Sequence, residues 1–443
     1  MTFSSLFEVG RQMGLQEIEV FYMKNNSFSC EVFEQSVDSY SVSSTQGFSV
    51  RGIYEGKIGY TYTEDVLNYD AKSLIETVIN HARYIEKEDV AIIYGGEDDY
   101  TSLTLYHDAI NHVSAQDKID FLKTFETAAK ALDSRVKSVS YCAFANGESE
   151  VLIENTNGLS LHEKSNYAYT YLDVLVSDGI SNKSASKFIV STDFNVYDAN
   201  ALAQEIVEDA LSKLGGKPMT SDTYKTVLSN EVASDLLNAM SSCFSAEVVI
   251  KKMSLLADKC DTCVAASCVT LLDDPHLEGG LCSASFDGEG VATKPNTIIE
   301  SGVLKTYLHS LATAKHFKVS PTGNGMRDTY KGSVVISPSN FYFKAGELTR
   351  DDLFAYVDQG IYITDVQGLH SGLNTISGDF SLAANGYRIE DGQRSTPVSN
   401  ITISGNFFDL LTSIEKLGND LFFNLSGVGS PSLYIPKLSI SGE

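Results

Sequence analysis

The chain has 443 residues and a mass of 48.2 kDa, which is more than one hydrophobic core usually covers, so two domains are expected. Apolar residues make up 43% and charged residues 21%, with only 8 prolines, which indicates a folded protein rather than a disordered one. The 33 basic and 58 acidic residues give a net charge of −25, which repels nucleic-acid phosphates and anionic lipid headgroups. We therefore expect no direct nucleic-acid partner and no membrane partner.

The N-terminal sequence MTFSSLFEVGRQMG lacks the basic stretch, apolar run and small-residue cleavage site of a signal peptide. The longest nearly uncharged stretch, from Cys263 to Leu272, is far shorter than the roughly 20 residues that span a bilayer. The 7 cysteines are odd in number and dilute, which is typical of free thiols in a reducing compartment. We therefore expect a soluble, cytoplasmic protein.

The first half of the chain begins with a strand pattern and continues with amphipathic helices. Residues 17–23 predict a strand, and residues 28–63 predict a β-meander whose clearest turn is Glu55-Gly56. Apolar residues at helical spacing follow Asp70 and again follow Ser114, which begins a capping-box pattern. Both segments are predicted to be helices that cover a sheet.

Residues 137–193 predict further strands in hairpins. Breaks are expected at Asn146-Gly147 and at 155–158, where the residue types favour positive φ. A third helix is predicted near 199–214 and ends at Gly215-Gly216, where glycine permits a left-handed cap.

The segment 215–225, rich in Gly, Pro, Ser and Thr, marks the expected domain boundary. We expect an α+β protein. Its N-terminal domain, residues 1–220, would be a β-meander and hairpins covered by helices. Its C-terminal domain, residues 221–443, would open with a helix near 230–248 and continue as mainly antiparallel β-structure.

Motifs of several common enzyme classes do not occur in the sequence, among them HExxH, the phosphate-binding GxxxxGK[ST] and a dinucleotide-binding fingerprint between a strand and a helix. A cluster of cysteines is the stronger candidate for a functional site, namely a metal site. Five of the 7 cysteines fall within 40 residues, with His276 among them: Cys243, Cys260, Cys263, Cys268 and Cys282. Such side chains can bind zinc, but a second closely spaced pair is missing, so buried free thiols are the favoured interpretation and a metal site the alternative.

Taken in order, several stretches resemble the PmbA/TldD family, whose first members gave it the label "modulator of DNA gyrase". The resemblance spans essentially the whole chain and depends on the order of these stretches more than on any one of them. They are Gly47-Phe48-Ser49-Val50-Arg51, residues 154–178, residues 294–310, the PTGNG sequence at 321–325, residues 360–393 and Gly418-Asn419-Asp420-Leu421.

TldD-type members of that family are metallopeptidases with HExxxH on a helix and a further cysteine ligand near the C-terminus. The resemblance aligns that motif with Asn238 for the first histidine, Ala239 for the glutamate and Cys243 for the second histidine. The segment 424–431 (NLSGVGSP) carries no cysteine. Because two ligand positions and the base are replaced, we expect no metal in this chain and zinc in a catalytic partner.

The resemblance implies a catalytically inert PmbA/TldE-type subunit, paired with a TldD-type catalytic sibling in a heterodimeric zinc metallopeptidase that acts on unfolded or small peptides. The C-terminal domain would carry both the degenerate site and the partner interface. Glycine-bounded strands within 290–325 and 376–390 would line the peptide cavity by accepting an added strand. The expected contact residues are Pro321, Thr322, Gly323, Asn324, Gly325, Ser377 and Gly378.

Two alternatives remain open from the sequence. One is a stand-alone homodimeric protein that binds peptides or acts as a scaffold. The other is a peptidase with a metal site rebuilt from cysteines between Cys243 and Cys282. A direct role at DNA conflicts with the net charge of −25, whereas an indirect effect through proteolysis of another protein does not.

Overall fold

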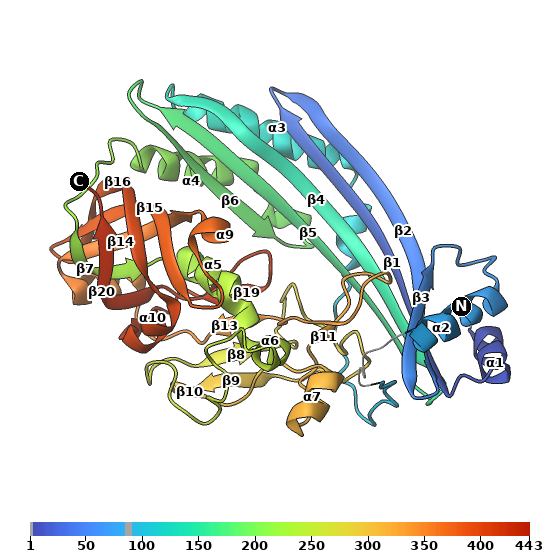
Figure 1. The fold of residues 1–443 in the computed structure, drawn as a ribbon. Helices are drawn as coiled ribbons and strands as arrows, with labels where there is room; N and C mark the ends of the chain where they lie inside the picture. The colour runs from blue at the N-terminus through green and yellow to red at the C-terminus, as the bar shows by residue number, and fades with distance from the viewer. Residues whose placement is uncertain (1–2, 85–90) are drawn as a thin grey trace. The chain divides into compact units, whose positions relative to one another are not determined.

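The computed structural model describes residues 3–84 and 91–443 and shows an α+β protein (Figure 1). The chain divides into two compact units. Unit 1 comprises Met1–Leu214, Phe286–Ala292 and Arg327–Val334, and unit 2 comprises Gly215–Ser285, Thr293–Met326 and Val335–Glu443. Two short segments of the second half of the chain therefore belong to unit 1. None of the helices in the described residues is long and apolar enough to cross a membrane.

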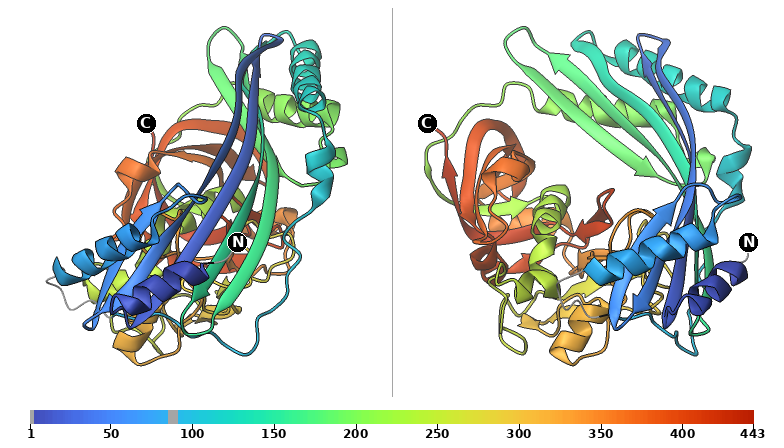
Figure 2. Two further views of the ribbon diagram at one scale, coloured as in Figure 1. Left: turned by 90° about the vertical axis from the view of Figure 1, so that its right-hand side faces the viewer. Right: turned by 45° about the vertical axis from the view of Figure 1, so that its right-hand side comes forward.

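Unit 1 is built on one six-stranded sheet in the order β3-β2-β1-β4-β5-β6, in which every neighbouring pair is antiparallel. The strands are β1 (Glu17–Phe33), β2 (Ser36–Tyr54), β3 (Lys57–Thr63), β4 (Val136–Asn155), β5 (Ser160–Ser177) and β6 (Asn182–Val190). The helical segments are α1 (Ser4–Gln12), α2 (Ala71–Tyr84), the 3-10 turn η1 (Asp108–His112), α3 (Ala115–Leu132), the 3-10 turn η2 (Phe194–Val196) and α4 (Ala199–Ser212). Figure 2 shows α3 and α4 near one end of the long strands and α1 and α2 near the other.

The helices bury two separate cores along the same strands. Ile18 and Val20 of β1 belong to the core under α1 and α2, while Cys30 and Val32 belong to the core under α3 and α4. Side chains two apart in a strand share a face, so one alternating pattern of β1 serves both cores. The capping box expected at Ser114 is present at the start of α3.

The hairpin turns confirm part of the sequence-based expectation and correct another part. Glu55 and Gly56 have φ angles of 50° and 77° and form the expected turn. The break expected at Asn146-Gly147 is wrong, because β4 continues through both residues and pairs there with β1 and with β5. A Cβ atom at Gly147 would lie 2.8 Å from the hydroxyl of Tyr167, so this glycine makes room for a ring rather than a turn.

A buried ion network holds the segment Arg327–Val334 within unit 1. The Oε1 atom of Glu19 accepts hydrogen bonds from Nε of Arg51 at 3.0 Å and from Nη2 of Arg327 at 2.6 Å. The side chains of Glu19 and Arg327 are 0% and 2% exposed. Burial opposes the ionisation of Glu19, but the two guanidinium groups outweigh it and hold the pKa of the carboxyl below its usual range.

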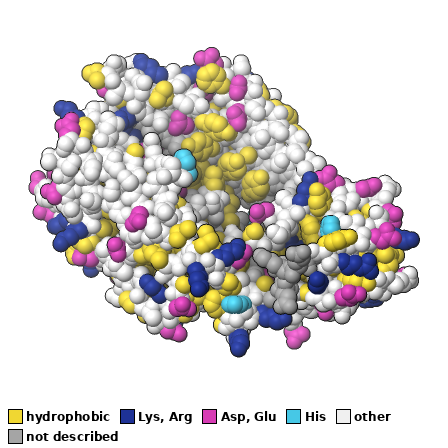
Figure 3. Space-filling model, viewed as in Figure 1, with side chains coloured by type: hydrophobic (Ala, Val, Ile, Leu, Met, Phe, Trp, Pro, Cys, Tyr) yellow, Lys and Arg dark blue, Asp and Glu magenta, His cyan; other side chains and the backbone are white. Residues whose placement is uncertain are grey.

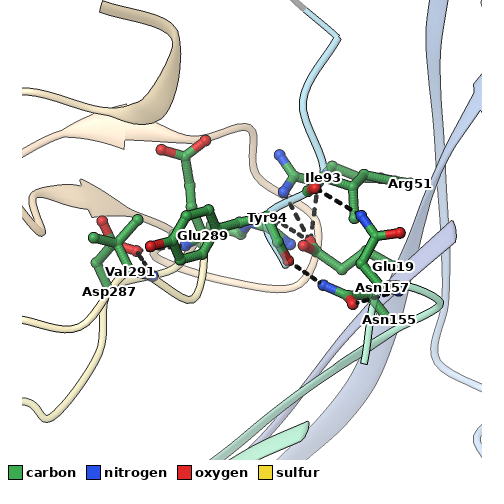
Figure 4. A network of polar contacts seen from close by, with 10 residues as sticks. Glu19, Arg51, Ile93, Tyr94, Asn155, Asn157, Asp287, Glu289 and Val291 are labelled. Carbon is green, nitrogen blue, oxygen red and sulfur yellow. Dashed lines mark hydrogen bonds and ion pairs between the residues drawn. The ribbon is translucent and has the colours of Figure 1, made fainter. Parts of the chain in front are cut away.

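Neutral hydrogen bonds add to this attachment. The hydroxyl of Tyr60 donates to the carbonyl oxygen of Tyr330 at 2.6 Å, and that of Tyr100 donates to the carbonyl oxygen of Gly290 at 2.8 Å. Figure 4 shows the surroundings of Glu19 and Arg51, where the Asn155 side chain donates to the carbonyl oxygen of Tyr94 at 2.6 Å. Both segments from the second half of the chain are thus fixed to strands or loops of the first half.

Unit 2 contains a sheet that closes on itself. Its order is β16-β15-β14-β7-β20-β17, and an additional pairing of β16 with β20 joins five of these strands into a ring. The strands are β7 (Asp222–Leu228), β14 (Gly360–Gln367), β15 (Asp379–Glu390), β16 (Gln393–Asn406), β17 (Lys416–Leu417) and β20 (Leu433–Ser441). Most pairs are antiparallel, but β7 and β14 run parallel.

The rest of unit 2 consists of short strands and helices. A second sheet has the order β10-β9-β8-β13-β19-β18, and β11 pairs with β12 alone. These strands are β8 (Leu271–Asp273), β9 (Asn296–Glu300), β10 (Val303–Leu304), β11 (Gly325–Met326), β12 (Val335–Ile336), β13 (Phe341–Phe343), β18 (Phe422–Phe423) and β19 (Val428–Ser430). The helical segments are α5 (Asn230–Met240), the 3-10 turn η3 (Ser241–Phe244), α6 (Ala246–Ile250), α7 (Leu311–Phe317), α8 (Arg350–Val357), α9 (Leu369–Gly372) and α10 (Phe407–Ser413).

The ion network predicts that substitutions of Glu19 and of Arg327 lower the free energy of unfolding by different amounts. We expect Glu19→Gln to lower the free energy of unfolding by about 3–5 kcal/mol, because it leaves two guanidinium groups buried without a carboxylate. Arg327→Gln should cost less, since Arg51 still pairs with Glu19. Urea unfolding of the purified variants measures both values.

The matched control is Glu76→Gln, which removes an exposed partner of Lys72 on α2 and should change stability little. Equal losses for Glu19→Gln and Arg327→Gln, or a loss below about 1 kcal/mol for Glu19→Gln, would contradict the network as described.

Candidate functional site

Helix α5 carries the positions that the family resemblance assigns to a metal site. The helix begins where the hydroxyl of Ser229 accepts a hydrogen bond from the amide of Val232 at 3.2 Å. Its buried face is apolar and packs into the main core of unit 2, with Val232, Ala233, Leu236, Leu237 and Met240. Asn238 and Ala239 are half-buried.

Cys243 lies beyond α5, in the 3-10 turn η3, and is completely buried in the same core. Burial raises the pKa of its thiol well above the ordinary value. A cysteine binds zinc as the thiolate, so this burial opposes a ligand role. The carbonyl of Cys243 accepts a hydrogen bond from the hydroxyl of Ser254 at 2.7 Å, as expected of a structural position.

The hairpin between β18 and β19 packs against α5 and contains the segment 424–431, where the resemblance leads one to look for a third ligand. Its turn is organised by Asn424, whose Oδ1 atom accepts hydrogen bonds from the amides of Ser426 at 3.0 Å and Val428 at 3.1 Å. The Nδ2 atom of Asn424 donates to the Oδ1 atom of Asp235 at 3.2 Å. An amide side chain thus links the hairpin to the helix.

Asp235 is the carboxylate of α5 that faces this hairpin. The residue is exposed by its accessible area, yet the protein packed around its carboxylate raises its pKa, and the negative charge of Asp365 adds to this effect. The hydrogen bond from Asn424 acts in the opposite direction. Asp235 and Asp365 are two carboxylates, and among the described residues no third His, Cys, Asp or Glu completes a metal-binding group with them.

The cysteine cluster considered from the sequence is not assembled around a common point. Within residues 3–84 and 91–443, no group of three or more His, Cys, Asp or Glu side chains is placed to hold a metal ion. All 7 cysteines are free thiols, but the expectation that the clustered ones are buried is correct only for Cys243: Cys260, Cys263 and Cys268 are exposed, and Cys282 is half-buried. Those of Cys263 and Cys268 donate to the carbonyl oxygens of Ala265 and Ile414, each at 3.3 Å.

The loop Pro321–Gly325 is mostly internal to unit 2. Thr322, Gly323, Asn324 and Gly325 are buried, and Pro321 is half-buried. The hydroxyl of Thr322 accepts from the amide of His309 at 2.7 Å, and Nδ2 of Asn324 donates to Oδ2 of Asp273 at 2.8 Å. These polar groups hold the loop in place, which leaves Pro321 as its most accessible side chain.

The second expected contact segment, Ser377 and Gly378, lies just before β15. The hydroxyl of Ser377 donates to the carboxylate of Asp379 at 2.8 Å. Gly378 has a φ of 80°, and a Cβ atom there would lie 2.7 Å from the ring of Phe408. A side chain is therefore excluded at this position by packing within unit 2.

The expectation that a peptide adds as a strand to the segment 376–390 is wrong. β15 pairs with β14 along one edge and with β16 along the other, so its backbone groups are already used. The same holds for β9, which lies between β8 and β10. Neither β15 nor β9 therefore offers a free edge to an added peptide strand.

Two buried titratable groups of unit 2 escaped the sequence analysis, because nothing in their local pattern indicates burial. Asp273, at the end of β8, accepts hydrogen bonds from the amide and hydroxyl of Ser339 at 2.7 and 3.0 Å. Burial raises its pKa to about 6 against those bonds. Burial lowers the pKa of His309 to about 4.

These two groups predict opposite pH dependences of stability. A histidine whose folded pKa lies below the unfolded value of about 6.5 destabilises the fold as pH falls from 6.5 to 4. An aspartate whose folded pKa lies above the unfolded value of about 3.8 destabilises it as pH rises from 3.8 to 6. Between about pH 4.5 and 7 each effect amounts to about 2 kcal/mol.

We therefore expect His309→Gln to make the protein relatively more stable at about pH 4.5, and Asp273→Asn relatively more stable at about pH 7. The measurement is the difference in unfolding free energy between the two pH values for each variant and the wild type. Ala312→Gln, at an exposed position of α7 that carries no titratable group, is the control and should leave that difference unchanged. Shifts of the same sign in both variants would contradict the assignment.

The chain is similar along most of its length to one family of known proteins. Three models of the PmbA/TldA metallopeptidase match the chain: domain 1 over residues 18–82, the central domain over residues 108–214 and the C-terminal domain over residues 221–442. The metalloprotease PmbA of Escherichia coli O157:H7 is 23% identical over 429 residues, which cover 96% of this chain and 92% of that protein.

Solved structures agree with these matches. A crystal structure described as a putative modulator of a DNA gyrase, from Thermotoga maritima, superposes with a TM-score of 0.92 at 29% identity and covers 99% of both chains. TldE from Thermococcus kodakarensis superposes with a TM-score of 0.90 at 21% identity, covering 99% of this chain and 100% of that one, and shares the fold. With its matched domains extending from residue 18 to residue 442, the chain belongs to the PmbA/TldD family.

Proposed function

We propose that this chain is a catalytically inert, PmbA/TldE-type subunit of a heterodimeric zinc metallopeptidase that acts on unfolded or small peptides. The observation that carries the proposal is the replacement of all three motif positions on and after α5 by Asn238, Ala239 and Cys243. The active chemistry would reside in a sibling that keeps HExxxH. The location would be the cytoplasm.

The residues present do not fit a catalytic zinc ion. Two histidines on one helix face supply nitrogen ligands, and a glutamate takes the proton of the metal-bound water. Asn238 offers a weak amide ligand, and the methyl group of Ala239 cannot accept a proton. The thiol of Cys243 is neutral and enclosed by apolar side chains.

Although the motif positions of α5 are replaced, the apolar face by which the helix packs into the core is present. Leu236, Leu237 and Met240 are almost completely buried, so the helix contributes to the core whatever happens to its polar positions. Loss of chemistry with retention of the fold supports a role in binding or in shaping a cavity. We place the partner interface on the C-terminal domain, residues 221–443.

A direct role at DNA is not supported by the charge of the chain. The net charge is −25, and on the face drawn in Figure 3 the blue Lys and Arg side chains are interspersed with magenta Asp and Glu. Nucleic-acid binding requires a basic surface that follows the phosphates. Any effect on a gyrase would therefore be indirect, through peptide or protein turnover.

The test is a mild-salt pull-down of the tagged chain from its own host, with zinc analysis and peptidase assays of the material obtained. We expect a near-stoichiometric HExxxH-bearing sibling, and peptide hydrolysis by the complex that a chelator abolishes. The chain purified alone should hold less than about 0.1 zinc per molecule and should not cleave peptides, because filled zinc sites are stoichiometric.

As a control, Asn238→Ala in this chain should leave the activity of the complex unchanged, whereas loss of the sibling's glutamate should abolish it. Stoichiometric zinc or peptide hydrolysis in the isolated chain would overturn the inert assignment. Recovery of the tagged chain without a sibling would overturn the heterodimer and favour a stand-alone binding protein.

A further inference from the structure

A row of tyrosines lies on the long sheet of unit 1, outside its buried cores. Helix α3 packs against β4 and helix α4 against β5, on the face that holds Leu172 and Val174. Side chains alternate between the two faces of a strand, so Tyr167, Tyr169 and Tyr171 of β5 lie on the opposite face. None of the buried apolar clusters of the described residues includes these three rings.

Small residues on the neighbouring strand make room for these rings. Three pairs lie directly opposite each other, with no bulge between them: Ala143 with Tyr171, Ala145 with Tyr169, and Gly147 with Tyr167. A Cβ atom at Gly147 would lie 2.9 Å from two ring carbons of Tyr167, so this ring leans over β4. The ring centroids of Tyr167 and Tyr169 are 6.2 Å apart, and their planes differ by 20°. The rings therefore follow the strand direction in a regular row.

Tyr141 of β4 extends the row at one end, where its ring centroid lies 5.4 Å from that of Tyr171. We call Tyr141, Tyr167, Tyr169 and Tyr171 the tyrosine platform. Tyr141 and Tyr167 are 43% and 42% exposed, and the other two are half-buried. A contiguous patch of exposed aromatic side chains is typical of an interaction site.

The charges on this face of the sheet are acidic. The carboxylate of Glu31 on β1 accepts a hydrogen bond from the hydroxyl of Tyr141 at 3.0 Å, and Asp173 lies directly opposite Tyr141. Level with the platform, no Lys or Arg occupies this face of β1, β2, β4, β5 or β6. Lys213 acts on Asp173 from the end of α4, but it forms an ion pair with Asp209 at 2.9 Å. The platform thus ends between two carboxylates.

The spacing of the rings matches an extended peptide with basic side chains. Side chains two apart in an extended chain repeat every 6.8 Å or so, about the distance between the rings of Tyr167 and Tyr169. Lys and Arg bind tyrosine rings by cation–π contacts within about 6 Å. Arg83 lies in this way over Tyr54 at 5.0 Å. Among residues 3–84 and 91–443, no Lys or Arg lies over a platform ring.

We propose that the tyrosine platform binds an extended peptide that carries Arg or Lys at alternate positions, with Glu31 and Asp173 holding the cation at one end. Charge complementarity selects this occupant, because a face with only acidic charges, on a chain of net charge −25, attracts basic peptides and repels acidic ones. The inference rests on the proposed function in that it names the class of peptide and the face that holds it. The partner interface proposed on the C-terminal domain is a separate surface.

The test measures binding of a short labelled peptide that alternates arginine and serine, by fluorescence anisotropy with the purified full-length chain. A peptide of equal length that alternates glutamate and serine should not bind. The double variant Tyr167→Ala/Tyr169→Ala should weaken binding about tenfold, and Glu31→Gln about two- to fivefold. A chain of net charge −25 attracts any cation, so the neutral ring replacements separate the platform from this general attraction. Tyr84→Ala, at an exposed tyrosine at the end of α2, is the matched control and should leave binding unchanged.

Equal binding of the basic and acidic peptides overturns the inference, as does a double variant that keeps its thermal midpoint and binds like the wild type. A photoreactive form of the arginine–serine peptide should label the wild-type chain within residues 141–149 or 165–173. Labelling confined to other segments contradicts the platform, and this measurement does not depend on the folding of a variant. Because neither assay requires hydrolysis, a complex that cleaves peptides while this chain fails to bind the probe refutes the inference and leaves the proposed function intact.

Discussion

The carboxylate of Glu19 is the point on which the architecture of unit 1 depends. It is buried on β1 between two guanidinium groups, one from the neighbouring strand and one from a segment 308 residues later in the chain. A single buried charge would be very costly, and the two guanidinium groups that bind its Oε1 atom offset that cost. The network thus attaches segment 327–334 to unit 1, while segment 286–292 is attached by the hydrogen bond from Tyr100 to Gly290.

The cluster around Phe21 shows how this attachment is completed. Phe21 lies on the face of β1 opposite Val20 and packs with Ile153, Leu159, Phe286 and Tyr330. Residues from the first and second halves of the chain thus share one small core. The ion network is directional and fixes the position of segment 327–334, and apolar burial around Phe21 adds non-directional stabilisation of both segments.

Local patterns predicted the elements whose cause is local. The turn at Glu55-Gly56 and the capping box at Ser114 each depend on neighbours within a few residues, and both were correct. The helix expected near 230–248 begins where predicted, but α5 ends at Met240 and is followed by η3 and α6. Asn146-Gly147 has the composition of a turn, but pairing on both sides of β4 and the ring of Tyr167 override that preference. Helix α1 and the burial of Asp273 and His309 were missed.

In the candidate site, too, features with a local cause could be predicted from the sequence, and features that depend on the tertiary fold could not. The replacements at Asn238, Ala239 and Cys243 can be read from the sequence, because they are identities at fixed spacing. Burial of Thr322 and Asn324 cannot, since it depends on residues such as His309 and Asp273 that lie elsewhere in the chain. The Glu19–Arg327 pair is invisible to any local pattern, because the two residues are related only through the tertiary fold.

The ring of strands in unit 2 has a consequence for how this protein is made. Its first strand, β7, pairs with its last, β20, and the backbone amide of Glu443 donates to the carbonyl oxygen of Met219 at 2.9 Å. A nascent chain leaving the ribosome cannot close that ring until residues 433–441 of β20 have emerged. A similar but weaker constraint applies to unit 1, because its ion network cannot be completed until Arg327 has been synthesised. During much of translation the Glu19 carboxylate in the long sheet of unit 1 therefore lacks its partner Arg327. In this period both units are incompletely folded and are possible substrates for chaperones.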